Sequence, residues 1–301
     1  MSECIDPSKK PLISIVTPSY EQGEFLVDTI RSVMHQDYPR IEHWVIDGGS
    51  TDETIDILKR FEHETGTDER YTLRWLSEPD RGQSHAINKG FDRAEGDIIG
   101  WLNSDDMYFD KQTFEVVEAT LRKRNASVLY GDDVVVGPDN NILRVDHKYR
   151  YSRSRLLRSC YICQPAVFFR RAVLEEDRLN ESLDYVMDYE LWLRLSERYN
   201  FIHLNRIVAV DRNHRDRKIL NEREEMLKEG RYVQKKYGQE FGPRYGMGRL
   251  TDKLYSGWNR LRGAATILNL VSREDLIVSL DFNSWLALLS RQLFAKNRNL
   301  V

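Results

Sequence analysis

The chain has 301 residues, of which 41% are hydrophobic and 31% charged, and its formal net charge at pH 7 is −3. This composition suits one large domain with an appendage or two small domains, and the small net charge gives no reason to expect nucleic acid as a partner. No run of about 18 apolar residues occurs, and the polar start MSECIDPSKK does not resemble a signal peptide. We therefore expect a cytoplasmic location.

Three cysteines, an odd and small number, also fit a reducing compartment. Cys160 and Cys163 form a CxxC pair, but no second Cys or His pair stands at zinc-ligand spacing. Small core residues are therefore favoured over a zinc or redox site.

The first hundred residues alternate between strand and helix patterns. Short apolar runs predict strands at 12–17, 43–47, 71–76 and 97–102. Helical spacing of apolar residues follows the first run over 23–36 and the third over 83–94, and residues 50–53, Ser-Thr-Asp-Glu, have the form of a capping box that opens a further helix. This alternation predicts an α/β fold with a mostly parallel central sheet flanked by helices.

Beyond about residue 125 the pattern changes. Residues 127–146 look like a hairpin, 166–169 and 201–210 like strands, and the stretch LDYVMDYELWLRLSERY like a helix with an acidic first turn. From about residue 220 onward, the sequence predicts several helices.

Polar residues follow each of the first four predicted strands. These groups are Thr17 to Tyr20, Asp47 to Gly49, Glu78 to Arg81 and Asn103 to Asp106. Each group alone is ordinary turn chemistry, but the carboxyl ends of parallel strands meet at one edge of a sheet, where ligands bind. Adjacent carboxylates at the fourth strand end could hold a hard divalent cation together with phosphate oxygens.

The stretches ISIVTPSYEQGEFLVDTIRSVMHQDYP, VIDGGSTDET, GQSHAINKGFDRAEGDIIGWLNSDD and MDYELWLRL occur in this order and together resemble the family 2 glycosyltransferases of the GT-A fold. The resemblance covers residues 11 to 215 approximately. It implies transfer of a sugar, with inversion, from a nucleoside diphosphate donor to a hydroxyl of a glycan or lipid-linked acceptor, with Mn²⁺ or Mg²⁺ as cofactor. UDP is the expected nucleotide, with GDP and dTDP as alternatives.

The resemblance also assigns residues to the donor. It places Asp47 at the nucleobase and Arg81 near the diphosphate, and it implies that the loop after the first strand packs against the nucleoside. The loop residues are Thr17, Pro18, Ser19 and Tyr20.

The metal motif of the family falls on Asn103-Ser104-Asp105, so that Asn replaces its first acid. The resemblance leaves Asp105 as the main metal ligand with Asp106 beside it, and it places Ser104 in the donor site. A later Arg-x-His segment adds His214 as a ligand of the metal or phosphate. Arg212 of this segment would offset the charge of the departing nucleoside diphosphate.

Asp188 matches the family's general base, the second member of an acidic pair whose first position is Met187 here. One carboxylate that takes the acceptor proton is enough for a single displacement, which inverts the configuration. A helix N-cap is the alternative role of Asp188.

The resemblance divides the chain into a catalytic domain, 1–218, and a helical C-terminal extension, 219–301. Within the domain, about 11–125 forms the nucleotide-sugar half and about 126–218 the acceptor half. Two other functions remain open, namely a degenerate protein that binds a nucleotide sugar or glycan without turnover, and a sugar nucleotidyltransferase. The second normally has a glycine-rich basic loop after the first strand, which TPSYEQGEF lacks.

Two segments outside these motifs could bind an acceptor, a membrane or another protein subunit. Residues 144–158 mix Lys and Arg with tyrosines and suit a solvated loop, the phosphate group of a lipid-linked acceptor, or an anionic membrane surface. In the extension, Trp285, Leu289 and Leu293 form a stripe beside basic residues. This stripe suits packing onto the catalytic domain, a homodimer contact, or contact with the inner face of the membrane.

Overall fold

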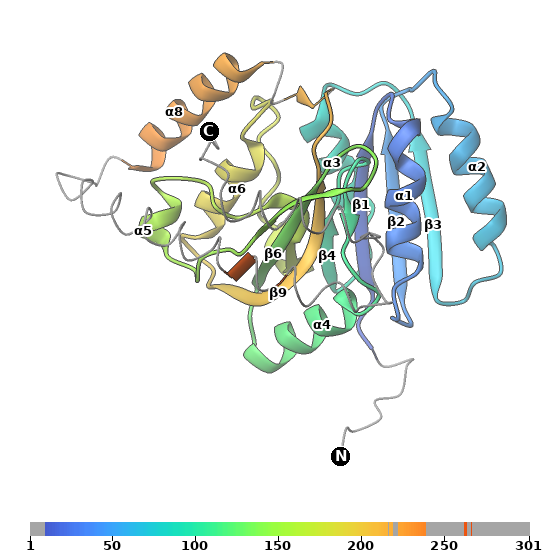
Figure 1. Cartoon of the computed structure of the whole chain (residues 1–301), viewed down its shortest axis with the longest axis horizontal. Coiled ribbons are helices and arrows are strands. Elements are labelled where there is room, and N and C mark those ends of the chain that lie inside the picture. The colour runs from blue at the N-terminus through green and yellow to red at the C-terminus, as the bar shows by residue number, and fades with distance from the viewer. Residues whose placement is uncertain (1–9, 216, 219–221, 239–261, 264–265, 267–301) are drawn as a thin grey trace.

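The protein is an α/β structure built on one large sheet (Figure 1), seen in a computed structural model that describes residues 10–215, 217–218, 222–238, 262–263 and 266. The sheet has nine strands in these residues, in the order β3-β2-β1-β4-β8-β6-β9-β5, and β7 pairs with β6. The strands are β1 (Ile13–Ser19), β2 (Ile41–Asp47), β3 (Tyr71–Ser77), β4 (Ile98–Trp101), β5 (Met107–Tyr108), β6 (Val128–Val136), β7 (Ile142–Asp146), β8 (Val167–Arg170) and β9 (Phe201–Arg212).

Helices cover both faces of the sheet. They are α1 (Gly23–Met34), α2 (Thr54–Thr65), α3 (Gln83–Arg93), α4 (Thr113–Arg124), α5 (Arg153–Leu156), α6 (Met187–Leu195) and α8 (Arg223–Gly238), with short 3₁₀ turns η2 (Gln164–Ala166) and η3 (Arg171–Leu174). In Figure 1, α4 lies at the lower edge of the sheet and α8 lies beside α6 at the upper left.

The fold has three layers, namely the sheet and the helices on each of its faces, and the side chains of β1 alternate between the two faces. Ile13 and Ile15 point to one face and pack in a core cluster with residues of α1, α2 and α4, whereas Val16 points to the other face and packs with residues of α3 and α6. Helix α3 approaches β1 closely because Gly90 has no side chain. A Cβ at this position would lie 2.2 Å from Cγ1 of Val16.

The four strands β1 to β4 pair in parallel, with β1 between β2 and β4. Their register places Ser19 opposite Asp47, and Asp47 opposite Ser77, so three carboxyl ends lie level with one another. We call β1 to β4 with α1, α2 and α3 the parallel region. The expected edge, where the loops after these strands meet, is therefore present.

The rest of the sheet, β6 to β9 with α6, forms a mixed region. Strand β8 is antiparallel to β4 and β6, β6 and β7 form the expected hairpin, and β9 is parallel to β6. Strand β9 also pairs antiparallel with the two-residue strand β5, which follows the polar segment after β4. The end of β9 is thereby brought next to the tip of β4.

These elements confirm the expected α/β architecture, and the predicted strands differ from the observed ones by a few residues. The predicted capping box is wrong. Helix α2 begins at Thr54, and Ser50 donates its hydroxyl to Asp47 instead of capping a helix. Asp52 takes over part of the capping role by accepting the N–H of Thr54 at 3.0 Å.

Helix α4 and strand β5 were not predicted. Of the expected helical extension, α8 lies in the described residues, whereas the Trp285, Leu289 and Leu293 stripe lies outside them. No helix in the described part of the chain is both long and apolar enough to cross a membrane.

Candidate functional site

A cleft of about 630 Å³ lies at the carboxyl ends of β1 and β4. The parallel region contributes the loop after β1, the loop after β3 and the polar segment after β4. The mixed region contributes the segment before β8, the start of α6 and the segment after β9. The predicted residues in the walls are Pro18, Ser19, Tyr20, Ser104, Asp105, Asp106, Asp188 and His214.

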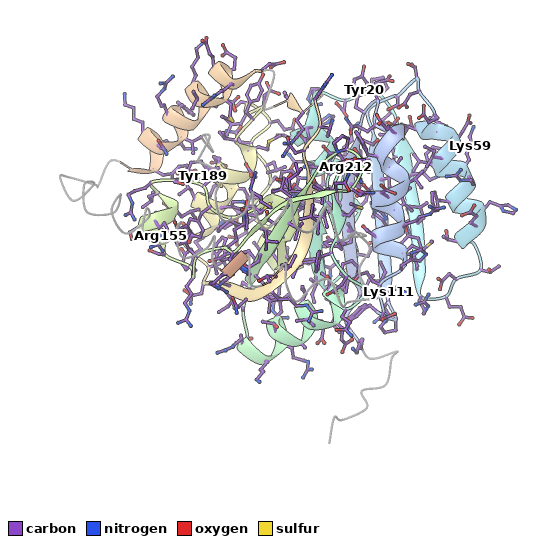
Figure 2. All side chains as sticks on the ribbon, in the orientation of Figure 1. Tyr20, Lys59, Lys111, Arg155, Tyr189 and Arg212 are labelled. Carbon is purple, nitrogen blue, oxygen red and sulfur yellow. The ribbon has the colours of Figure 1, made fainter. Side chains whose placement is uncertain are left out.

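Of the four residues predicted for the loop after the first strand, Thr17, Pro18 and Ser19 belong to the end of β1, and three of the four, Pro18, Ser19 and Tyr20, line the cleft. Tyr20 is 62% exposed and lies at the upper edge of the molecule in Figure 2. The hydroxyl of Ser19 is buried and has no hydrogen-bond partner in the described chain, so it is available to a ligand. Thr17 lies deeper in the sheet, where its hydroxyl and Nε2 of His43 are 2.9 Å apart.

Two other predicted donor residues lie outside the cleft walls. Asp47 is fully buried, and its Oδ2 accepts the backbone N–H groups of Gly49 at 3.0 Å and Ser50 at 2.9 Å. These bonds shape the loop after β2. Arg81 is exposed and pairs with Glu181 at 2.7 Å.

The predicted metal ligands come together from two distant parts of the chain. Oδ2 of Asp105 and Nε2 of His214 are 3.0 Å apart. Asp106 lies beside them and is 3% exposed, and its Oδ1 accepts the backbone N–H of Arg212 at 3.0 Å. The pairing of β5 with β9 thus joins the tip of β4 to the segment that carries His214.

Charge is concentrated in this wall. The pKa of Asp106 is raised well above its ordinary value, first by burial and then by repulsion from Asp105 and Asp211. Arg217 faces the same carboxylates, and its guanidinium contacts Oδ1 of Asp211 at 2.9 Å. Both Asp211 and Arg217 line the cleft, although the sequence motifs did not single them out.

The donor set fits a hard divalent cation. Carboxylate oxygens and an imidazole nitrogen are ligands that Mn²⁺ accepts, and Mg²⁺ is bound through carboxylates and substrate phosphates. Nδ1 of His214 is buried without a hydrogen-bond partner among the described residues. Asp105 and His214 thus bring two ligand atoms of this kind together, with the carboxylate of Asp106 in the same wall.

Asn103, at the first position of the metal motif, makes hydrogen bonds to residues of three different elements. Its Oδ1 accepts hydrogen bonds from Nε1 of Trp101 and Nε2 of Gln83, both at 2.9 Å. Its Nδ2 donates to Oε1 of Gln164 at 3.0 Å. An amide can accept on one side and donate on the other, which a carboxylate cannot do, so this position joins β4, α3 and η2.

Arg212 is buried and does not line the cleft; its label lies near the middle of the view in Figure 2. Its guanidinium pairs with Asp28 at 2.9 Å and donates to the carbonyl groups of Asp105 and Pro138, each at 2.9 Å. It also lies over the ring of Phe25, 4.9 Å from the centroid. Arg212 therefore holds the segment that carries Asp105, and Arg217 is the arginine that reaches the cleft.

Asp188 opens α6 in the opposite wall, as the sequence predicts. Its Oδ1 accepts the N–H of Tyr189 at 2.7 Å, and burial raises its pKa to about 6. A carboxylate with this pKa is ionised at neutral pH and is a stronger base than an ordinary aspartate. Gln164 and Pro165, in η2 before β8, also line the cleft.

One expectation for other residues needs correction. Cys163 lines the cleft and Cys160 is exposed, so neither is a core residue. In the basic segment 144–158, three cations pair within the protein: Arg144 with Asp146, Lys148 with Asp133, and Arg153 with Glu197.

Comparison with known proteins agrees with this geometry. Residues 14–178, more than half of the chain, match the family model described as glycosyl transferase family 2. The chain belongs to this family. The family 2 match ends before Asp188 and His214, so it covers the parallel region and only part of the mixed region.

A curated relative, the hyaluronan synthase of Pasteurella multocida, is 28% identical over 202 residues, which are 66% of this chain and 20% of that protein. This family 2 chain thus spans about a fifth of the length of that relative.

Two solved structures resemble the fold. The S. aureus TarS 1–349 structure in complex with UDP-GlcNAc has a TM-score of 0.59 at 17% identity, covering 94% of this chain and 71% of that one. The mannosyltransferase PcManGT from Pyrobaculum calidifontis, in complex with GDP-Man and Mn²⁺, has a TM-score of 0.58 at 20% identity, covering 94% and 80%. The expected GT-A fold is confirmed.

Proposed function

We propose that this protein is an inverting glycosyltransferase that moves a sugar from a nucleoside diphosphate donor to a hydroxyl group of a glycan or lipid-linked acceptor. The observation that carries the proposal is one cleft with a basic carboxylate, Asp188, in one wall and the Asp105 and His214 pair in another. Such an arrangement suits one group that removes a proton and another that receives a charged leaving group.

The donor side is supported by its polar groups. Tyr20 offers an exposed ring and Ser19 a hydroxyl without a partner in the described chain, and both line the cleft. Asp105, Asp106 and His214 would hold Mn²⁺ or Mg²⁺, which when bound neutralises charge on a diphosphate. Arg217 adds a positive charge in the same wall, in the role that the sequence assigned to Arg212.

The names of the structural relatives support the substrate class. TarS was solved with UDP-GlcNAc and PcManGT with GDP-Man, so nucleotide sugars are the class of donor expected here. UDP remains the first choice, and GDP and dTDP follow.

On the acceptor side, Asp188 would take the proton of the acceptor hydroxyl. The oxygen of this hydroxyl would bond to the anomeric carbon of the donor sugar while the bond between that carbon and the diphosphate breaks. The proton stays on Asp188 until product leaves, and the electron pair of the broken bond goes to the diphosphate. A single displacement of this kind inverts the configuration, and it needs no second carboxylate as nucleophile.

The test is the Asp188→Asn variant, which keeps the shape of the side chain and removes its basicity. We expect donor affinity, measured by calorimetry, to be unchanged and transfer, measured by released nucleoside diphosphate, to fall about a hundredfold or more. The product's anomeric configuration is read by NMR. Glu197→Gln, an exposed change beyond the end of α6, is the control.

A variant that transfers at the wild-type rate would remove Asp188 from the role of base, and a product with retained configuration would exclude the single displacement. Wild-type protein that binds the donor but never transfers its sugar to any acceptor would favour a degenerate binding protein.

A further inference from the structure

The segment before α6, the helix that carries Asp188, is hydrogen-bonded to a residue of α8. Val186 precedes α6, and its own side chain makes no capping hydrogen bond. Unpaired N–H groups at the start of a helix need acceptors from elsewhere. Asp184, Tyr185 and Val186 present three consecutive backbone N–H groups in the approach to Asp188.

The carboxylate of Glu229, on α8, accepts all three. Its Oε1 accepts the N–H of Asp184 at 2.9 Å, and its Oε2 accepts those of Tyr185 at 2.9 Å and Val186 at 3.3 Å. Hydrogen bonds to an ionised acceptor are stronger than those between neutral groups. Successive N–H groups that converge on one anion resemble the backbone nests that bind anions elsewhere.

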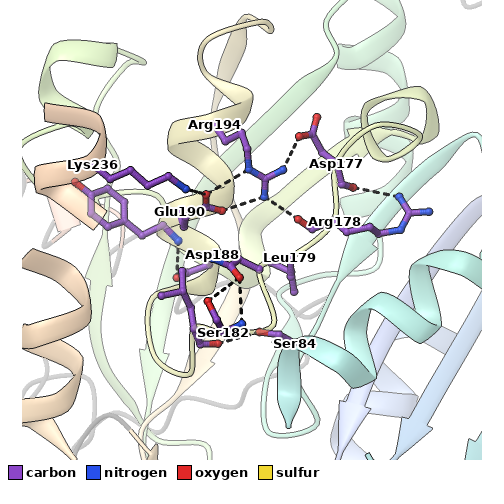
Figure 3. Close-up of polar contacts among 12 residues, drawn as sticks. Ser84, Asp177, Arg178, Leu179, Ser182, Asp188, Glu190, Arg194 and Lys236 are labelled. Carbon is purple, nitrogen blue, oxygen red and sulfur yellow. Dashed lines mark hydrogen bonds and ion pairs between the residues drawn. The ribbon is translucent and has the colours of Figure 1, made fainter. Parts of the chain in front are cut away.

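A second contact keeps α8 in register with α6. The carboxylate of Glu190 accepts hydrogen bonds from Lys236 at 3.3 Å and from the hydroxyl of Tyr237 at 2.5 Å. Nη2 of Arg194 also forms an ion pair with Oε2 of Glu190, 3.0 Å away. Arg194 in turn pairs with Asp177 (Figure 3).

Apolar packing supports the same contact. Val233, between these two polar contacts, is fully buried and belongs to the core cluster that contains Leu191 of α6. This packing holds the backbone of α8, from which Glu229 extends, against the region of α6.

We propose that Glu229 is a positioning residue for Asp188, an inference that rests on the proposed function of Asp188 as general base. Glu229 does not line the cleft and so contacts no substrate there, whereas Asp184 and Tyr185, which it holds, do line it. Its effect passes through the backbone, since Val186 lies two residues before Asp188. A shift of about 1 Å in a reacting group can cost about a hundredfold in rate.

The chemistry requires a carboxylate at this position. A carboxylate has two acceptor oxygens for the three N–H groups, whereas the amide of glutamine has one oxygen and would turn its own N–H₂ toward a backbone N–H. Aspartate keeps both oxygens on a shorter side chain. Glutamine should therefore disturb the segment more than aspartate does.

The experiment compares Glu229→Gln and Glu229→Asp with Glu225→Gln in the full chain. Glu225 lies on the same helix, is exposed and pairs with Lys228, so it controls for loss of charge on α8. For each variant, kcat for transfer, the melting temperature and the Kd of whichever of UDP, GDP and dTDP the wild type binds with Mn²⁺ are measured.

For Glu229→Gln we expect kcat to fall about tenfold or more while the Kd stays within about twofold, because the donor wall is untouched. Glu229→Asp should recover part of kcat, and Glu225→Gln should behave as the wild type. Wild-type kcat in Glu229→Gln would overturn the inference. A parallel loss of kcat, donor affinity and melting temperature, with no recovery in Glu229→Asp, would reduce Glu229 to a purely structural role and also overturn it.

The two proposals fail in different ways. If Asp188→Asn still transfers sugar, the base assignment is wrong and the inference falls with it. If Asp188→Asn is inactive and Glu229→Gln is fully active, the base assignment stands and the positioning role of Glu229 alone is wrong. If Glu229→Gln does not fold, Glu229→Asp decides the question by the same comparison of kcat with Kd.

Discussion

The parallel and mixed regions secure their buried carboxylates with different kinds of group. In the parallel region, Asp47 accepts hydrogen bonds from the backbone N–H groups of Gly49 and Ser50 and from the hydroxyl of Ser77. In the mixed region, buried carboxylates pair with cations, as Asp133 does with Lys148 and Asp177 with Arg194. Asp47 is thus held by neutral donors, whereas these carboxylates of the second region depend on a partner of opposite charge.

The largest effect on stability should come from breaking a buried pair of the mixed region. Lys148→Met leaves Asp133, which is 1% exposed, beside Asp211 without its cation. Loss of one partner of a buried ion pair costs about 3 to 5 kcal/mol. Urea unfolding measures this change, with Arg81→Met as the control in the parallel region, because an exposed pair is worth about 0 to 1 kcal/mol. Equal losses in the two variants would contradict the comparison.

Asp105→Ala should abolish the Mn²⁺ dependence of donor binding and weaken that binding about a hundredfold, while the fold is kept. The expectation follows from the contact of Asp105 with His214, which joins the tip of β4 to the segment after β9. Calorimetry with and without Mn²⁺ measures it, and Asp56→Ala on the exposed side of α2 is the control. Unchanged Mn²⁺-dependent binding would remove Asp105 from the site.

Asn103→Asp restores the acid usual in the family motif, and we expect it to destabilise this protein. A carboxylate would face Oε1 of Gln164 and the buried Asp106 in place of a donating amide. A buried polar group left without a partner costs about 1 to 3 kcal/mol. Thermal unfolding of the variant against Asn103→Ser measures the change, and a more stable aspartate variant would show that this position tolerates the charge.

The pH profile of transfer should show an acidic limb near pH 6 that belongs to Asp188. Asp188 accepts a proton only when ionised, and its pKa is raised by burial from 3.8 to about 6. Transfer should therefore fall about tenfold per pH unit below 6. Stability has the opposite sign, because a carboxyl whose folded pKa is raised favours folding at low pH and opposes it as the pH rises through this range.

The pH dependence of kcat/KM in the wild type, beside that of Asp188→Asn, tests this assignment. The acidic limb should disappear in the variant. A limb near pH 4 in the wild type would mean that Asp188 is not desolvated.

The pattern of apolar residues predicted most of the fold because it records which face of each element is buried. It also predicted that the ends of β1 and β4 meet, since parallel strands leave no other arrangement. Strand β5 escaped prediction because two residues carry no periodicity. The capping box failed because Ser50 has a stronger competing partner in Asp47.

The candidate site could be predicted only where its residues follow strands directly. Tyr20, Asp105 and Asp188 were found in this way or through the family resemblance, and all three line the cleft. Arg212 and Arg217 are five residues apart and equally basic, and only the path of the chain after β9 buries the first and turns the second into the cleft. Glu229 has no motif, because its role lies in where α8 packs.

Arg212 has a consequence for the order in which the protein is completed during synthesis. It connects Asp28 in α1 with the backbone at Asp105 and Pro138, and β9, which carries it, supplies the only partner of β5 among the described strands. A growing chain that has been made only as far as residue 178 has the parallel strands but lacks Asp188, Arg212 and His214. A chain made as far as residue 205 carries Asp188 but still lacks Arg212 and His214. Synthesis therefore completes the wall of the proposed base before the wall of the proposed metal ligands.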